Sequence, residues 1–354
     1  MKRREFIKLS SLMGAGAATA PAFLLGGCAA KPLPGTGTVT ATPTVCDICF
    51  WKCAGHVYRE DGELWKITGN ADDLHSGGRL CTRGTGGPGA YLDPDRLKKP
   101  LMRKAIDGRQ TFVEVEWDEA LDYIADKMKS IAATHGPAKL LMLNHGAGSS
   151  HFRHLLRAYG SDSRAEPAFA QCRGPRDVGF TLTFGESASS PERTDMANAR
   201  CIVLIGSHIG ENLHNGQVQT LAEALNKDVT LITVDPRFSV PAGKSKHWLP
   251  IKPGTDMALL LAWMHVSVNE GLYDREYVER YTTGFKELQD DLRTKTPEWA
   301  YTHTSIPAAT IVETARFIAG ARPASLIHPG RHVTWYGDDT QRSRAIAMLS
   351  ALLG

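Results

Sequence analysis

Apolar positions along most of the chain follow two periods, one helical and one typical of buried strands. From Trp117 to about residue 133, apolar side chains recur at helical spacing and predict a buried face made of Ala120, Leu121, Ile124, Ala125, Met128 and Ile131. Short, continuous apolar runs predict strands at 139–144, 201–206, 229–234 and 324–328. Further helices are predicted at 150–159, 216–226, 256–270, 307–319 and 339–353. Strands that alternate with helices predict an α/β fold with largely parallel sheets.

The loops at the carboxyl ends of such strands are where an α/β sheet binds its ligands. The candidate contacts in these loops, and in the turn that enters the 256–270 helix, are Gly206, Ser207, Asp235, Arg237, Gly254 and Asp256. A glycine after a strand lets the backbone approach a phosphate, and an acid at a strand end can hold ribose or base groups. Each loop alone also fits an ordinary turn, and Asp256 fits a helix cap. Together the loops predict a nucleotide-bearing cofactor.

Four cysteines before residue 101 form a C-x2-C-x3-C-x27-C set: Cys46, Cys49, Cys53 and Cys81. Three thiols within eight residues and a distant fourth suit the corners of a [4Fe–4S] cluster. Structural zinc more often takes two separated pairs of close cysteines, and disulfides are a third use of such residues. The spacing therefore favours the cluster and leaves zinc and disulfides as alternatives.

The residues around these cysteines predict a small domain over 44–100. The segments 56–58 and 63–67 flank Asp61-Gly62 and predict a β-hairpin. A domain of about 60 residues needs its metal for stability. Before it, the proline-containing segment 29–43 predicts an extended linker.

The first 28 residues have the pattern of a twin-arginine export signal. Arg3-Arg4 and a hydrophobic pair precede a weakly apolar run from Leu9 to Gly27, which is short and diluted for the alternative of a membrane anchor. Residues 25–28 also resemble a lipoprotein cleavage box with Cys28 as the lipidated residue. The prediction is a periplasmic protein that folds and takes up its cofactors before export, so that thiolates bonded to iron are protected from disulfide formation.

The length and net charge of the chain indicate how many domains it has and which partners it binds. The chain has 354 residues, 42% hydrophobic residues and a formal net charge of +3. This length suits about two or three domains, and so slight a charge gives no indication of nucleic-acid binding.

A fifth cysteine, Cys172, lies in the run Gln171-Cys-Arg173-Gly-Pro-Arg176. Two neighbouring arginines lower the pKa of a thiol and favour the thiolate. A soft, anionic sulfur is a suitable ligand for a high-valent metal. Cys201, in an apolar strand, is predicted to be a small core residue.

These motifs together resemble the catalytic subunit of the dimethyl sulfoxide reductase family of molybdopterin oxidoreductases. The resemblance rests on the four cysteines with Arg83 after them, on Val-Asp235-Pro-Arg237, on Leu-Pro-Ile-Lys-Pro-Gly254-Thr-Asp256 and on Cys172. It covers essentially the whole chain after the signal. The Cys-Phe-Trp-Lys-Cys and Gln-Cys-Arg-Gly-Pro-Arg runs are most similar to the polysulfide and thiosulfate reductase branch.

The resemblance implies roles for individual residues. Cys172 would ligate molybdenum, or tungsten in its place, and Arg83 would lie between cluster and pterin and assist electron transfer. The implied contacts of a bis-molybdopterin guanine dinucleotide cofactor are Gly206, Ser207, Asp235, Arg237, Gly254 and Asp256. Many relatives carry an Asn-Pro pair where this chain has Ser207-His208, so phosphate contacts are less well defined there.

The resemblance also implies an organisation and an assembly. Residues 101–354 would form doubly wound α/β domains, with 101–165 and 324–354 in one lobe and 166–323 in the other. Because members of the family are longer, the chain resembles an N-terminal portion without the last pterin-binding domain. The implied partners are an iron–sulfur electron-transfer subunit and a membrane anchor subunit that oxidises quinol.

The implied activity is reduction of a sulfur compound such as polysulfide, thiosulfate or tetrathionate. Candidate contacts for an anionic substrate are His145, Arg173, Arg331 and His332, although the two histidines can also simply bond the backbone. Arsenate reduction, nitrate reduction and formate oxidation are alternatives within the family. A non-catalytic cluster-carrying subunit and a zinc-stabilised binding module are alternatives of other classes.

Overall fold

The structure is a computed structural model that describes residues 37–49, 51–144, 149–165, 173–185, 193–207, 209–211, 215–330 and 337–354. The predicted export signal with Cys28 lies outside the described residues. So do four of the predicted site residues: His145, Cys172, Arg331 and His332.

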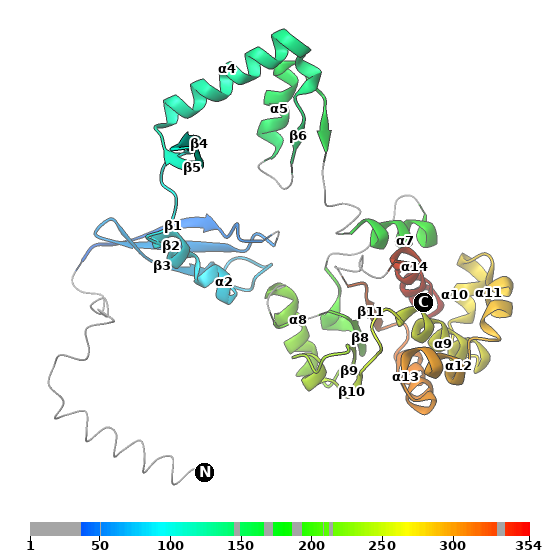
Figure 1. Cartoon of the computed structure of the whole chain (residues 1–354). Helices are drawn as coiled ribbons and strands as arrows, with labels where there is room; N and C mark the ends of the chain where they lie inside the picture. Colours follow the sequence, from blue (N-terminus) through cyan, green and yellow to red (C-terminus); the bar gives the residue numbers. More distant parts are fainter. Residues whose placement is uncertain are drawn as a thin grey trace. The chain divides into compact units, whose positions relative to one another are not determined.

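The first described element is a three-stranded sheet in the order β1-β2-β3 (Figure 1). It consists of β1 (Val39–Val45), β2 (Ala54–Glu60) and β3 (Glu63–Gly69). Asp61 and Gly62 join β2 to β3 with φ of 50° and 86°, the left-handed conformation that a two-residue hairpin turn requires. The predicted hairpin is therefore confirmed. One end of the sheet, formed by residues 37–42 and 57–66, is a compact unit of its own.

Strand β1 corrects the predicted linker, which was expected to extend to residue 43. Residues 39–45 read Val-Thr-Ala-Thr-Pro-Thr-Val. β-branched side chains favour extended backbone on a pleated surface, and a proline is tolerated at the edge of a sheet. The order of strands places β1 at such an edge.

The central sheet has four parallel strands in the order β10-β9-β8-β11. They are β8 (Cys201–Ile205), β9 (Thr230–Val234), β10 (His247–Leu249) and β11 (Ser325–His328). The three strands predicted in this region are confirmed to within a residue at each end. Their apolar runs are nearly continuous because both faces of the sheet are covered. β10 escaped prediction because three residues show no period.

Helices cover both faces of this sheet and make it doubly wound, as predicted. The helices after residue 173 are α7 (Gly174–Phe184), α8 (Asn215–Leu225), α9 (Asp256–Asn269), α10 (Arg275–Tyr281), α11 (Phe285–Leu292), α12 (Pro297–Thr304), α13 (Ala308–Gly320) and α14 (Asp339–Leu352). Val203 and Ile205 of β8 belong to the core that contains α9, whereas Ile202 and Leu204 belong to a second core with Leu221 of α8. Successive strand residues point to opposite faces, so one strand supplies both cores.

Helix α9 is apolar on every side because it is surrounded by other elements. Trp263 is fully buried at its centre and donates from Nε1 to Thr314 Oγ1 of α13 at 2.9 Å. This bond satisfies the indole N–H in an otherwise apolar core.

The segment 324–354 lies with the central sheet, which corrects its expected assignment to a lobe with 101–165. β11 pairs in parallel with β8, from Ser325 opposite Cys201 to His328 opposite Leu204. α14 packs against α7 and α9. The backbone ladder and the packing of α14 therefore join this segment to the layers built by 201–269.

Residues 101–165 form a separate set of elements. β4 (Leu101–Ile106) and β5 (Arg109–Glu114) make an antiparallel hairpin. α4 (Trp117–His135) and α5 (Ser149–Tyr159) confirm the two predicted helices. The predicted strand 139–144 is reduced to β6 (Met142–Leu143), which pairs in parallel with β7 (Arg164–Ala165), because residues 137–139 form a 3-10 turn.

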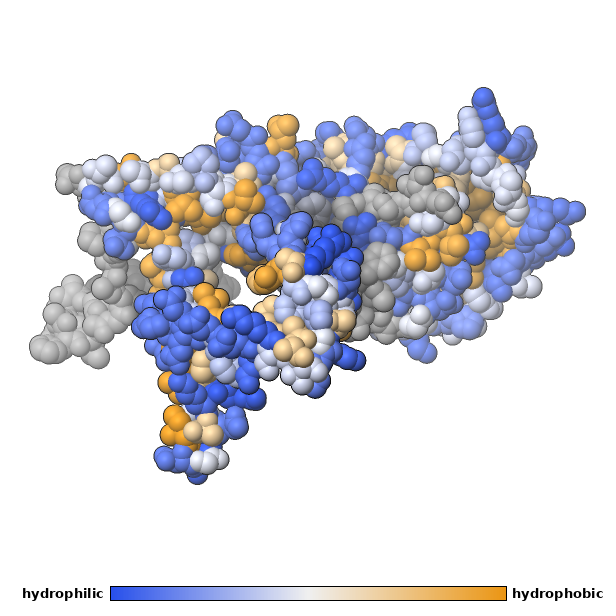
Figure 2. Space-filling view, turned by 90° about the horizontal axis from the view of Figure 1, so that it is seen from above, coloured by the Kyte–Doolittle hydropathy of each residue, from blue (hydrophilic) through white to orange (hydrophobic). Residues whose placement is uncertain are grey.

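The predicted burial of the apolar face of α4 is wrong, because no residue of this helix is buried. Leu121 and Ile124 are 54% and 52% exposed. α4 packs on the 3-10 turn at 137–139 and accepts a hydrogen bond from Tyr159 Oη at Met128 O, 2.7 Å long. These neighbours are too small to cover the whole face. Exposed apolar groups appear as orange areas among the hydrophilic surface in Figure 2.

Among the described helices, none is both long enough and apolar enough to cross a membrane.

Gly179 of α7 marks a close approach of two helices, and substituting it tests this packing. A Cβ at Gly179 would lie 2.7 Å from Arg344 N and 2.9 Å from Thr340 O, both on α14. Gly179→Ala should therefore lower the free energy of unfolding by about 1–3 kcal/mol. Gly320→Ala is the matched control, because a Cβ at that helical glycine meets open space. Thermal unfolding followed by circular dichroism measures both, and equal midpoints for the two variants would contradict the close approach.

Candidate functional site

The four predicted cluster cysteines come together around one pocket. Cys46, Cys49 and Cys53 lie on the loop between β1 and β2, and Cys81 immediately precedes the short helix α2 (Thr82–Thr85). The same pocket is lined by Ile48, Trp51, Leu80, Arg83, Gly84 and Asn215. All four thiols are free of disulfide bonds. Since the surrounding side chains are largely apolar, sulfur ligands there would be shielded from water.

Backbone contacts hold the cysteines at this spacing. Cys46 N donates to Cys53 O at 2.8 Å and closes the first loop on itself. A Cβ at Gly84 would lie 3.4 Å from Cys46 Sγ and 3.3 Å from Leu80 Cβ, so the helix that follows Cys81 approaches the first loop closely. Because Gly84 has no side chain, the segment that carries Cys81 can lie close to the loop that carries the other three cysteines.

Asp73 ties the segment before Cys81 to the first cysteine loop. Its Oδ2 accepts from Ala54 N at 2.9 Å and from Ser76 Oγ at 2.6 Å, and its Oδ1 accepts from His75 N at 3.0 Å. The hydrogen bond from Ser76 holds the pKa of Asp73 below its usual value, so the carboxylate is charged at neutral pH. The ring of His75 also stacks on Trp51, with centroids 5.1 Å apart.

The four sulfurs surround a space rather than a single point. In the described part of the chain, no three His, Cys, Asp or Glu side chains lie close enough together to hold one metal ion. Cys53 is only 7% exposed, and burial raises the pKa of its thiol. Metal bonding by this thiol therefore requires loss of a proton that burial makes harder to remove.

The predicted nucleotide contacts meet at the carboxyl ends of β8 and β9. Gly206 has a φ of 58° and donates from its N to Val234 O at 2.9 Å, and Ser207 after it is buried. Asp235 is also buried, and its Oδ1 accepts from Arg237 N at 2.9 Å. Because β8 and β9 are neighbours in the sheet, these residues lie at one edge, as the sequence predicted.

Arg237 is paired with Glu211, a residue that the sequence did not single out. Arg237 Nη2 lies 2.6 Å from Glu211 Oε2, and this hydrogen bond raises the pKa of the guanidinium. Glu211 Oε1 accepts from Val240 N at 2.8 Å. Glu211 therefore links the loop after β8 to the loop after β9.

Gly254 and Asp256 lie at the entrance to α9. Gly254 has a φ of 81°, which favours glycine. Asp256 Oδ2 lies 3.6 Å from Arg342 Nη1 of α14. Arg342 is 9% exposed, and its Nε and Nη2 have no hydrogen-bond partner among the described residues. Sequence reasoning missed Arg342 because it occupies a regular position in a predicted helix.

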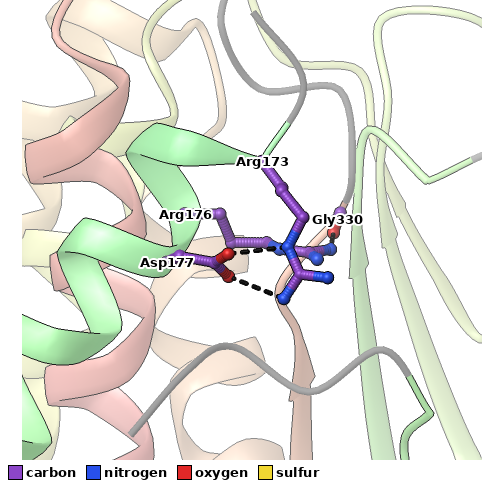
Figure 3. A network of polar contacts seen from close by, with 4 residues as sticks. All are labelled: Arg173, Arg176, Asp177 and Gly330. Carbon is purple, nitrogen blue, oxygen red and sulfur yellow. Dashed lines mark hydrogen bonds and ion pairs between the residues drawn. The ribbon is translucent and has the colours of Figure 1, made fainter. Parts of the chain in front are cut away.

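The start of α7 carries a second group of charges, drawn in Figure 3. Arg173 Nε lies 2.6 Å from Asp177 Oδ2, and its Nη2 lies 3.2 Å from Oδ1, so the pair is bidentate. Arg176 is 2% exposed and donates from Nη1 to Gly330 O. Arg173 adjoins Cys172 in the sequence, and Gly330 adjoins Arg331. The start of α7 is thus hydrogen-bonded to the residue before Arg331.

Two family models match the chain and together span these sites. The molybdopterin oxidoreductase Fe4S4 domain matches residues 39–90, and molybdopterin oxidoreductase matches residues 96–354. The chain belongs to the molybdopterin oxidoreductase family. This confirms the family and the fold class that the motifs indicated.

Curated relatives and a solved structure agree with the family. The thiosulfate reductase molybdopterin-containing subunit PhsA of Salmonella typhimurium is 33% identical over 100% of this chain and 46% of the relative. The dimethyl sulfoxide reductase DmsA of Escherichia coli is 28% identical over 100% of this chain and 49% of the relative. The structure of acetylene hydratase from Pelobacter acetylenicus aligns with a TM-score of 0.72 and 27% identity, covering 88% of this chain and 43% of that one. The chain spans about half the length of these curated relatives.

The two domains of this family indicate a [4Fe–4S] cluster and bis-molybdopterin guanine dinucleotide as the cofactors. The Fe4S4 match favours the cluster over the zinc and disulfide alternatives. The residues present fit the cluster, because four free thiols line one pocket with apolar neighbours. They also fit an anionic group nearby, because Nε and Nη2 of Arg83 in this pocket are buried and have no hydrogen-bond partner among the described residues. The role of Arg83 in electron transfer stays a prediction.

Cys81→Ser tests the cluster site. We expect the iron content to fall from about four atoms per chain and the visible sulfur-to-iron absorption to weaken, because one corner of the cluster loses its thiolate. Cys201→Ala is the control: Cys201 is fully buried in β8, burial raises the pKa of its thiol to about 12, and it lies in the apolar core. Iron analysis of protein purified without air measures both. Full iron content in Cys81→Ser would contradict the assignment.

Proposed function

We propose that this chain belongs to the catalytic subunit of a molybdenum-dependent respiratory oxidoreductase that reduces a sulfur compound, and that it carries the cluster of that subunit. Polysulfide, thiosulfate and tetrathionate are the proposed substrates. The similarity to a thiosulfate reductase subunit along the full length of this chain carries the proposal. The four-cysteine pocket supports it, because a respiratory reductase needs an entry point for single electrons.

Some residues of the chain are proposed to bind the cofactors, and Arg83 is proposed to attract negative charge. When bound, the cofactors supply the redox chemistry, with single electrons on the cluster and a two-electron change at molybdenum. Cys46, Cys49, Cys53 and Cys81 hold the cluster, and Cys172 supplies a thiolate to the metal. Arg83 is half-buried and places a cation beside the cluster pocket, where it favours the arrival of negative charge.

The residues at the carboxyl edge of the sheet are proposed to hold the nucleotide part of the cofactor. Asp235 offers a buried carboxylate that is proposed to accept from ribose or base donors, and its Oδ1 also accepts from Arg237 N. Gly206 leaves open space where a side chain would be, which lets the backbone approach a phosphate. Ser207, Arg237, Gly254 and Asp256 complete the proposed set.

Four residues are proposed to attract an anionic substrate. Arg173 is held by both oxygens of Asp177, so much of its charge is compensated locally. Arg331 and His332, which follow Gly330 in the sequence, are proposed contacts as well. His145 is a further proposed contact.

We propose an assembly with partner subunits from the same similarity to the family. An iron–sulfur subunit would deliver electrons to the cluster, and a membrane anchor subunit would take them from quinol. The enzyme would act in the periplasm after export by the twin-arginine route. Arsenate or nitrate reduction, formate oxidation and a non-catalytic electron-transfer role are the competing functions.

An electron-acceptor screen on the complete subunit tests the substrate. With reduced viologen as the donor, we expect oxidation with polysulfide, thiosulfate or tetrathionate, and slower or no oxidation with arsenate or nitrate. The absorbance of the viologen measures each rate. Nitrate or arsenate as the best acceptor would move the function to another branch of the family, and no turnover with any acceptor by fully loaded protein would favour the non-catalytic role.

Cys172→Ala tests the metal ligand. Loss of the thiolate should abolish acceptor reduction and alter the molybdenum electron paramagnetic resonance signal, while the iron content stays unchanged. Cys201→Ala again serves as the control, with expected retention of both signals because this thiol is packed in the central sheet. Molybdenum and iron analysis accompanies the spectra. Unchanged molybdenum content and signal in Cys172→Ala would exclude this residue as a ligand.

A further inference from the structure

An apolar groove with a volume of about 660 Å³ lies between α4, the segment around β6 and α5 (Figure 1). We call it the α4–α5 groove. Its lining residues are apolar except for Asn144 and Ser149, and none of them carries a charge. Five of the apolar lining residues are more than half exposed: Ile124, Leu141, Leu143, Phe152 and Leu155. An exposed apolar surface of this extent marks an interaction site.

The strands beside the groove form an incompletely covered sheet. β6 and β7 are joined through α5 and pair in parallel, with Met142 opposite Arg164 and Leu143 opposite Ala165. Within the described residues, this sheet has no third strand. Parallel sheets occur almost only where both faces are covered. Leu141 and Leu143 lie two residues apart and thus on one face of the segment, and their exposure shows that this face is uncovered.

The chemistry of the groove separates the kinds of occupant. Transient partners are recognised largely through charged and polar groups, whereas permanent interfaces are more apolar and resemble a section through a domain core. The absence of charge among the lining residues favours a permanent interface. A small apolar ligand needs walls that enclose most of its surface, but the side chains that line this groove are themselves half exposed.

The length of the relatives indicates where a permanent occupant comes from. The chain spans about half the length of the curated relatives, so these relatives carry about as much polypeptide again outside the matched region. A segment of the same polypeptide is present at a high effective concentration, which a separate protein lacks. Such a segment therefore needs no charged steering groups to reach an apolar surface.

We propose that the α4–α5 groove is covered by polypeptide of the same catalytic subunit that lies outside residues 1–354, in a permanent apolar interface. The covering segment lays apolar side chains against Phe152 and Leu155 of α5 and against the uncovered face of Leu141 and Leu143. The same contact buries Ile124 of α4, as its helical spacing predicted. The proposal rests on the proposed assignment of this chain to a longer catalytic subunit, but not on which substrate that subunit reduces.

Site-specific photo-crosslinking in the complete subunit tests the proposal. Phe152→p-benzoylphenylalanine keeps an aromatic ring at this position and places a photoreactive ketone in the groove. On irradiation we expect a product with the mass of a single subunit. Mass spectrometry should then find residue 152 joined to a peptide from outside residues 1–354. The iron content and the visible cluster absorption of the variant show that it has folded.

Asp126→p-benzoylphenylalanine is the matched control on the opposite side of α4. Asp126 lies two residues after Ile124, which is more than half a helical turn away, and its side chain is 77% exposed. We expect no product with the covering peptide from this position. An equal yield from Asp126 and Phe152 would overturn the proposal, because the probe would then react with any nearby surface.

The other results of the experiment are decisive as well. A cross-link to a peptide within residues 1–354 would show that the chain covers its own groove, and one to a second copy or another protein would show an intermolecular interface. Either result would overturn the proposal, and so would the absence of any product in folded protein. If the Phe152 variant does not fold, Leu155→p-benzoylphenylalanine takes its place. Because turnover is not measured, failure of the sulfur-compound assignment would leave this result unchanged.

Discussion

The convergence of four cysteine sulfurs from two separate segments is the constraint on which the amino-terminal half depends. Three of the cysteines lie on one loop, so the structure must bring Cys81 back to it. Asp73 holds the returning segment against this loop, because its carboxylate accepts hydrogen bonds from both Ala54 N and Ser76 Oγ. A Cβ at Gly69 would lie 2.3 Å from Gly78 O, so the returning segment also needs a glycine at the end of β3. A region with so small a core gains much of its stability from the metal that these contacts prepare for.

The central parallel sheet brings polar residues from distant parts of the chain to one edge. A loop with predicted cofactor contacts follows each of β8 and β9, and the pairing of the two strands brings Gly206 and Asp235 to the same edge of the sheet. The Arg237–Glu211 pair then joins the two loops. Burial of apolar strands supplies the rigidity, and the loops supply the contacts. Asn215, the first residue of α8, also lines the pocket of the four cysteines and donates to Arg79 O.

Sequence patterns predicted local structure well where a single period or spacing was decisive. The cysteine spacing indicated the cluster, the apolar runs indicated β8, β9 and β11, and helical spacing indicated α8, α9, α13 and α14. The patterns failed where neighbours decided the outcome. Leu121 and Ile124 have the spacing of a buried face but are half exposed, since α4 meets few neighbours in the described chain. The segment 324–354 was assigned to the wrong lobe because strand order is not encoded in any single strand.

The sequence by itself indicated the family, and it predicted the cluster cysteines and the loops proposed to bind the cofactor, because these depend on residue type and short spacing. The tertiary structure alone decided which charges are compensated and which distant segments contact one another. The sequence indicates Arg173 as a contact for an anionic substrate, but both oxygens of Asp177 pair with it, and Arg176 donates to Gly330 O, 154 residues away. Asn215 meets Arg79 over 136 residues. Such contacts arise from packing of whole elements, so no local pattern could have predicted them.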